Sequence, residues 1–174
     1  MKTVSTQLTG HERTFGEDEI LVSKTNPKGV ITYTNHVFCR VSGYSEEELL
    51  GRPHSIIRHP SMPRCVFELL WKTIEGGREI FAYVVNLSKN GDHYWVFAHV
   101  TPTFGAARQI TGYHSNRRKP AKRGIEVFSV IYRQLLTEEQ RHSDWREGMD
   151  AATRMLQQTL ADRNVTYDEF VFSA

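Results

Sequence analysis

The residues able to do acid–base or metal chemistry are spread along the chain without the spacing that a catalytic motif needs. The eight histidines form no His-x-x-x-His zinc helix, and the sequence has neither a nucleophile elbow nor a Walker phosphate loop. Asp92 and His93 are adjacent, but a tight turn predicts an exposed pair rather than a catalytic one. Cys39 and Cys65 lie far apart among apolar residues, which predicts buried free thiols in a reducing compartment. These patterns favour a protein that is not an enzyme.

One amide stands out within an apolar strand pattern, and it suits ligand binding better than catalysis. Because side chains alternate along a strand, Asn86 shares one face with small apolar residues and can offer that face both a donor and an acceptor. The alternative interpretation is that Asn86 only begins a turn. The residues expected on this inner face are Ile80, Ala82, Val84 and Asn86 on one strand and Val96, Ala98 and Val100 on the next.

Composition fits one domain with an appendage. The 174 residues are 39% hydrophobic and 11% aromatic, enough for a packed core. The net charge of +2 argues against nucleic acid as the main partner. One basic cluster is interpreted as a solvated junction; it comprises Arg117, Arg118, Lys119, Lys122 and Arg123. The polar start lacks a signal-peptide core, and no apolar run approaches the roughly 20 residues that span a bilayer. We therefore expect a cytoplasmic protein without direct membrane insertion.

Two strands and a run of short helices are predicted in the first half. Asn35 can cap a helix, and Ser45 with Glu48 forms a capping box that opens another. The expected elements are strands at 20–25 and 30–34, short helices after Asn35 and Ser45, a loop over 52–63, and a longer helix from Arg64 to Gly76.

The second half changes to a strand pattern. Residues 80–86 and 94–100 are β-branched and aromatic, and they flank Asn90-Gly91, a strong hairpin signal. A last strand is expected around 109–116. This order predicts an α+β fold, a single antiparallel sheet with short helices on one face.

A helical tail is predicted at the end of the chain. After Pro120 the apolar residues follow helical spacing, and the closing segment 166–172 needs a surface to rest on. We divide the chain into an N-terminal lead-in over 1–19, flexible or weakly helical, a domain over 20–118 and a C-terminal tail over 119–174. The tail could pack on its own sheet or serve a partner.

The order of elements, together with the segment GYSEEELLG at 43–51, resembles a PAS domain over about 21–117. Within that superfamily, PHSIIRHPSMP at 53–63 and KNGDHYW at 89–95 are similar to the Aer aerotaxis receptor family. The resemblance implies FAD in the PAS cavity, with its redox state passed to chemotaxis signalling. Aer also carries a membrane anchor and a signalling module; since this sequence shows neither, it is most similar to stand-alone, CetB-type PAS proteins.

The resemblance also assigns site residues. It places the loop containing Arg58 and His59 over the ribityl chain and phosphates of the flavin, where a guanidinium suits a pyrophosphate. His59 could add a donor or stack on adenine, and Trp71 could cover the adenine, although core packing explains Trp71 equally well. Capping explains Asn35 without a ligand. The expected cofactor-binding residues are Asn35, Arg58, His59, Phe67, Trp71, Ile80, Ala82, Asn86 and Ala98.

The sequence departs from its relatives at three positions. Light-sensing PAS domains carry a reactive cysteine in a Gly-Arg-x-Cys motif, whereas His54 stands there in this chain, so no flavin–cysteine adduct is expected. Ser61 replaces an acidic residue and Ile80 replaces a tryptophan found in some Aer proteins. The affinity for FAD, or its pose, is therefore expected to differ.

Two other functions stay open at this point. One is a gas or redox sensor that binds haem b, because one axial imidazole is enough to hold the iron. The longer helix over 64–74, which usually supplies that ligand in haem PAS domains, contains no histidine. The other is a PAS adaptor with an empty cavity. The candidate haem ligands are His36, His54, His59, His93, His99 and His114.

The expected partner is a methyl-accepting chemoreceptor-type signalling protein, which would recruit this chain to a membrane receptor. PAS domains also commonly form homodimers. Trp95 and Phe97 should face away from the cavity, where exposed aromatic side chains would contact the lead-in, the tail or the partner.

Overall fold

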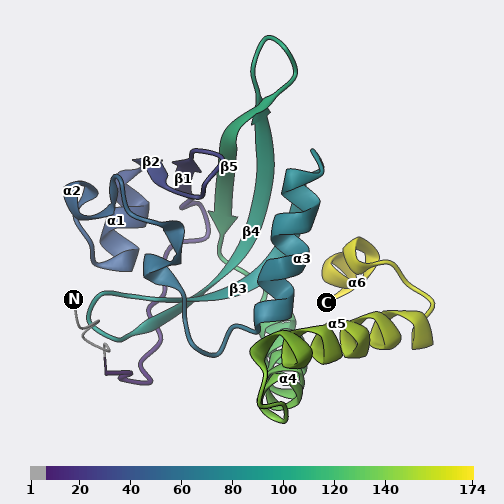
Figure 1. Ribbon diagram of the computed structural model, residues 1–174. Coiled ribbons are helices and arrows are strands. Elements are labelled where there is room, and N and C mark those ends of the chain that lie inside the picture. Colours follow the sequence, from purple (N-terminus) through teal and green to yellow (C-terminus); the bar gives the residue numbers. More distant parts are fainter. Residues whose placement is uncertain (1–6) are drawn as a thin grey trace.

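Five strands form one antiparallel sheet in the order β2-β1-β5-β4-β3 (Figure 1). The computed structural model describes residues 7–174. The strands are β1 (Leu21–Thr25), β2 (Ile31–Thr34), β3 (Ile80–Leu87), β4 (His93–Phe104) and β5 (Ile110–Arg118). The helices are α1 (His36–Ser42), α2 (Glu46–Leu49), the 3-10 turn η1 (His54–Ile57), α3 (Arg64–Glu75), α4 (Lys122–Gln140), α5 (Trp145–Asp162) and α6 (Tyr167–Ser173). The predicted α+β class is confirmed.

Local side-chain chemistry sets the ends of the short helices, as the sequence predicted. The Asn35 side chain accepts a hydrogen bond from the Phe38 amide at 3.0 Å and so caps α1. Gly43 ends that helix with φ at 75°, a conformation that glycine adopts without strain. Ser45 and Glu48 form the expected capping box of α2.

The C-terminal tail packs on the face of the sheet opposite the short helices, here called the outer face. Phe128 of α4 stacks on Tyr83 with ring centroids 4.6 Å apart, and the Tyr132 hydroxyl donates to the Tyr83 carbonyl oxygen at 2.6 Å. From α6, Phe172 contacts Phe81 at 4.8 Å. Helix α5 turns back and lies across the amino-terminal end of α3 (Figure 1). The tail therefore packs on its own domain, with α4 and α6 on the outer face of β3 and α5 on α3.

The aromatic residues predicted to face away from the inner face do so, and the tail covers them. Trp95 lies parallel to Tyr132 of α4 with ring centroids 6.3 Å apart. Phe97 meets Phe172 at 6.0 Å. Both side chains are partly buried by packing within this chain.

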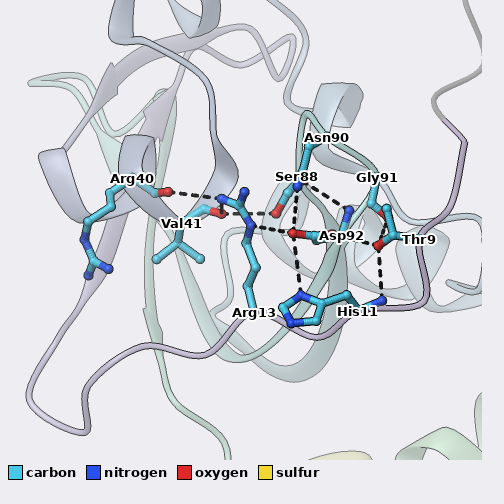
Figure 2. Close-up of polar contacts among 9 residues, drawn as sticks. All are labelled: Thr9, His11, Arg13, Arg40, Val41, Ser88, Asn90, Gly91 and Asp92. Carbon is cyan, nitrogen blue, oxygen red and sulfur yellow. Dashed lines mark hydrogen bonds and ion pairs between the residues drawn. The ribbon is translucent and has the colours of Figure 1, made fainter.

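The lead-in follows the β3–β4 hairpin and is fixed to it by a carboxylate (Figure 2). Asp92 accepts hydrogen bonds from the Thr9 hydroxyl at 2.7 Å and from Arg13 Nε at 3.0 Å, and Asn90 adds a third donor. These donors, Thr9 foremost, hold the pKa of Asp92 well below its ordinary value. The prediction that Asp92 and His93 form an exposed pair is wrong for Asp92, which is buried. The weakly helical alternative for the lead-in is wrong for residues 7–16, which form no helix, while residues 1–6 lie outside the described residues.

The free thiols behave as expected for packed side chains. Cys65 is buried and Cys39 is half-buried. Burial, helped by the neighbouring Glu139 carboxylate, raises the pKa of the Cys65 thiol to about 12, so this group is inert at neutral pH. Across residues 7–174, no helix has the length and apolar character needed to cross a membrane.

Candidate ligand-binding cavity

A cavity of about 760 Å³ opens between the inner face of the sheet, α3 and the loop over 52–63. This volume lies within the range of pockets that hold small organic ligands. Most of its wall is apolar, and the residues of this apolar wall include Ile57, Leu70, Ile74, Val84, Ala98 and Val100.

Backbone pairing positions the wall and the loop. Ala98 pairs with Ala82 across β3 and β4, and the small side chain of Ala98 lines the cavity. Two backbone bridges flank η1 within the loop, one from Pro53 to Val30 and one from Arg58 to Asn86. The Arg58–Asn86 bridge brings together the two polar residues that the sequence singled out.

Polar side chains line the cavity at two places, Ser115 and Arg117 on β5 and Asn86 on β3 beside Arg58, and not all of their polar atoms have hydrogen-bond partners. Asn86, Ser115 and Arg117 are buried, and Nδ2, Oγ and Nη1, respectively, lack a hydrogen-bond partner. Buried polar groups are normally paired, so these three atoms are available to a ligand or to water held in the cavity. The other guanidinium nitrogen of Arg117 donates to Ser23 Oγ at 2.9 Å and to His54 Nε2 at 2.7 Å.

The positive charge of Arg117 is uncompensated. Burial lowers the pKa of Arg117 to about 10, so the guanidinium remains charged at neutral pH. Burial and the charge of Arg117 together lower the pKa of His54 to about 3, which keeps its imidazole neutral. Since an arginine can only donate, Nε2 of His54 accepts and the ring proton sits on Nδ1. Among residues 7–174, no carboxylate forms an ion pair with Arg117.

The mouth of the cavity is also basic. Lys28, Arg58 and Arg64 line it, and the Arg58 guanidinium lies 4.4 Å from the centre of the Phe67 ring. Burial and the nearby Arg64 charge lower the pKa of Arg58. Glu68 supplies the lining carboxylate, and Lys72 pairs with it at 2.8 Å. The lining therefore carries a surplus of positive charge, which suits an anionic ligand.

Five of the nine residues expected to bind a cofactor line the cavity. They are Arg58, Phe67, Trp71, Asn86 and Ala98. Trp71 packs edge-on against Tyr113 at 5.5 Å and lies directly over Gly29, where a β-carbon would come within 2.9 Å of the indole ring. It thus forms the wall at the β1–β2 turn.

The other four residues lie elsewhere for identifiable reasons. Asn35 is engaged in capping α1, and its amide donates to the Ile20 carbonyl oxygen at 2.8 Å. The His59 ring is tilted against His93 at 5.8 Å, and its Nδ1 accepts from the backbone amide of Ser61. Two more residues face inward but are packed in the core outside this cavity, and they are Ile80 and Ala82.

The nine residues expected to bind a cofactor do not include three lining residues around Arg117 and two on the tail, and of these His54 was expected only as a candidate haem ligand. The prediction that the basic cluster is solvated is wrong for Arg117, which is 4% exposed. Alternation along β5 was the signal that could have found it, because every second residue from Tyr113 points inward, but the predicted strand stopped at 116. The residues left out of that set are His54, Ser115 and Arg117, with Trp145 and Met149 from α5.

A model of the PAS fold matches residues 31–117. The chain belongs to the PAS family. This PAS protein is 38% identical over 121 residues to the aerotaxis receptor of Escherichia coli (strain K12), a match that covers 70% of this chain and 24% of the receptor. It therefore spans about a quarter of that relative's length. The predicted PAS domain of the aerotaxis type is confirmed.

Solved structures show the same fold. An RNA-binding light-oxygen-voltage receptor superimposes with a TM-score of 0.57 at 21% identity, covering 70% of this chain and 35% of that one. A light-oxygen-voltage domain from a study of a flavin analogue superimposes with a TM-score of 0.56 at 21% identity, covering 71% and 87%. The chain thus has the PAS fold followed by a helical tail.

Proposed function

We propose that this PAS domain binds FAD as a redox sensor. The observation that carries the proposal is the buried polar lining of a mostly apolar cavity, in which Asn86, Ser115 and Arg117 each hold an unpaired polar atom. A flavin ring needs a flat apolar slot and hydrogen-bonding groups for its polar edge, and this arrangement offers both. The similar light-oxygen-voltage domain studied with a flavin analogue supports the same class of cofactor.

The basic mouth supports the dinucleotide form of the cofactor. Arg58, Arg64 and Lys28 line the cavity, and their charges would favour the phosphates of a bound FAD. Arg58 can offer its planar fork to two phosphate oxygens at once. A flavin without the second phosphate would leave part of this positive charge unpaired.

A flavin supplies reversible electron and proton transfer when bound. Asn86 can present either its carbonyl oxygen or its amide nitrogen to a ring edge, so it can follow a change of protonation. Arg117 favours added negative charge, since its guanidinium lacks a carboxylate partner among the described residues. Asn86 lies on β3, whose Tyr83 carbonyl accepts the Tyr132 bond from the tail. A shift of this strand would therefore reach α4.

Haem receives less support from the geometry. Of the six histidines considered as iron ligands, His54 lines the cavity. Its Nε2 already accepts a hydrogen bond from Arg117 at 2.7 Å, and a cation beside it disfavours a metal cation. The donors around this cavity suit a flavin edge better.

The output is proposed to be a separate chemoreceptor-type signalling protein, with this chain acting in the cytoplasm beside a membrane receptor. The 38% identity to the aerotaxis receptor supports that class of partner. Co-purification with such a receptor, in oxidised and reduced buffers, tests it; equal binding in both would contradict redox signalling.

The first experiment is the visible spectrum of the purified protein, followed by chromatography of any cofactor released by heat. A yellow protein that releases FAD, bleaches with dithionite and recovers in air is the expected result. A Soret band would replace the flavin with haem. A colourless protein that takes up no FAD on incubation would refute cofactor sensing and leave an assembly adaptor.

A further inference from the structure

The cavity is completed by a part of the chain that lies outside the PAS match. Trp145 and Met149, one helical turn apart at the start of α5, line the cavity mouth. The PAS match ends at residue 117. The tail therefore contributes directly to the wall of the site.

Several contacts hold the start of α5 at this position. The buried Glu139 carboxylate at the end of α4 accepts a hydrogen bond from the Cys65 amide of α3 at 2.9 Å. Gly148 packs so closely on the Glu139 backbone that a β-carbon there would overlap the carbonyl oxygen. Thr153 of α5 donates to Glu68 of α3 at 3.4 Å. The corner between α4 and α5 is thus fixed against α3, and Trp145 is fixed with it.

Trp145 is a large ring with half of its surface open to solvent at this mouth. It is 49% exposed, whereas most large apolar side chains of the chain are buried. The Arg146 guanidinium lies 5.0 Å from its ring centre, and Arg58 and Arg64 line the same opening. The adjacent Asp144 carboxylate is engaged in capping α5. An exposed indole among cations suits a heteroaromatic base that carries phosphates.

We propose that Trp145 binds the adenine end of a flavin dinucleotide and makes the cavity selective for FAD over FMN. This inference rests on the proposed function, because it needs a flavin in the cavity. The flavin ring would lie against the buried polar groups of β3 and β5, the phosphates would meet Arg58 and Arg64, and the base would meet the indole of the tail. FMN has the same ring and ribityl phosphate but no base, so it cannot use Trp145.

The test compares the two flavins on one set of variants. Flavin-free full-length protein is titrated with FAD and with FMN, and each Kd is measured by calorimetry. Trp145→Ala should weaken FAD binding by about ten- to a hundredfold, the range for one base stacked on an aromatic ring. Its affinity for FMN should stay within about twofold, since the contacts of the ring are untouched. Trp145→Phe should recover most of the FAD affinity.

Phe172→Ala provides the matched control. Phe172 is an aromatic residue of the same tail, 59% exposed, on the outer face away from the cavity. The inference is overturned if Trp145→Ala leaves the Kd for FAD unchanged, or if it weakens FAD and FMN equally. Wild-type protein that binds neither flavin would instead overturn the proposed function, and this inference with it.

Discussion

Replacing Arg117 with methionine should change folding stability and flavin binding in opposite directions. Methionine keeps much of the side-chain length but removes the charge. The buried guanidinium has a pKa of about 10 against an ordinary 12.5. Each unit of pKa corresponds to about 1.4 kcal/mol, so burying this charge costs the flavin-free protein about 3 kcal/mol.

Part of that cost is offset in the wild type by the bonds from Arg117 to Ser23 and His54. The variant loses both bonds. However, Ser23 Oγ and His54 Nε2 lie 3.1 Å apart and can bond each other. We therefore expect Arg117→Met to raise the free energy of unfolding of the flavin-free protein by about 1 to 2 kcal/mol.

Urea denaturation of the flavin-free protein at pH 7 measures this gain, with Arg118→Met as the control because Arg118 is the exposed neighbour on the same strand. The same variant should bind FAD at least about tenfold more weakly, since a hydrogen bond to a charged group contributes about 1.5 to 3 kcal/mol. A loss of stability above about 1 kcal/mol would refute the reasoning, because Arg117 would then hold the core together rather than serve a ligand.

Three further predictions address other parts of the molecule. His54 has a pKa of about 3 when folded and 6.5 when unfolded, so acid protonates the unfolded chain first and stability falls as the pH drops below 6.5. In the wild type this lowers the free energy of unfolding by about 1.5 kcal/mol between pH 6.5 and 5, and His54→Gln should remove that loss. Urea midpoints that fall equally with pH in the wild type and the variant would contradict this. Gly124→Ala would drive a methyl group into the Tyr83 ring and should cost about 1 to 3 kcal/mol of unfolding free energy; an unchanged thermal midpoint would count against it. Asp92→Asn should weaken the hold on the lead-in and speed trypsin cleavage after Arg13, with Asp150→Asn as the control. Equal cleavage rates would show that the backbone pairing alone holds this segment.

Strand alternation and helix capping allowed much of the fold and part of the site to be predicted. Asn86 and Ala98 face inward because their strands keep a period of two without interruption. The ends of α1 and α2 follow from Asn35 and Ser45, whose side chains satisfy amides a few residues away. These are local rules, and they hold without knowledge of the rest of the chain.

The positions of the other site residues depend on contacts between segments far apart in the sequence, which local sequence patterns do not reveal. The resemblance to the Aer family places His59 at the cofactor, but in the structure its ring nitrogen accepts from the Ser61 amide and its ring packs against His93. The charge pattern predicts that Arg117 is exposed with the neighbouring basic residues, but β5 continues to Arg118 and its alternation points Arg117 inward. Trp145 reaches the cavity only because α4 and α5 meet at a tight corner against α3.

The covering of the outer face by the tail affects how this protein can be handled. The division at residue 118 marks a change of secondary structure, yet a fragment cut there would expose the rings that α4 and α6 now bury. They include Phe81, Tyr83, Trp95 and Phe97. Such a contiguous aromatic surface promotes aggregation. The PAS core and its tail should therefore be expressed together, and unfold as one cooperative unit.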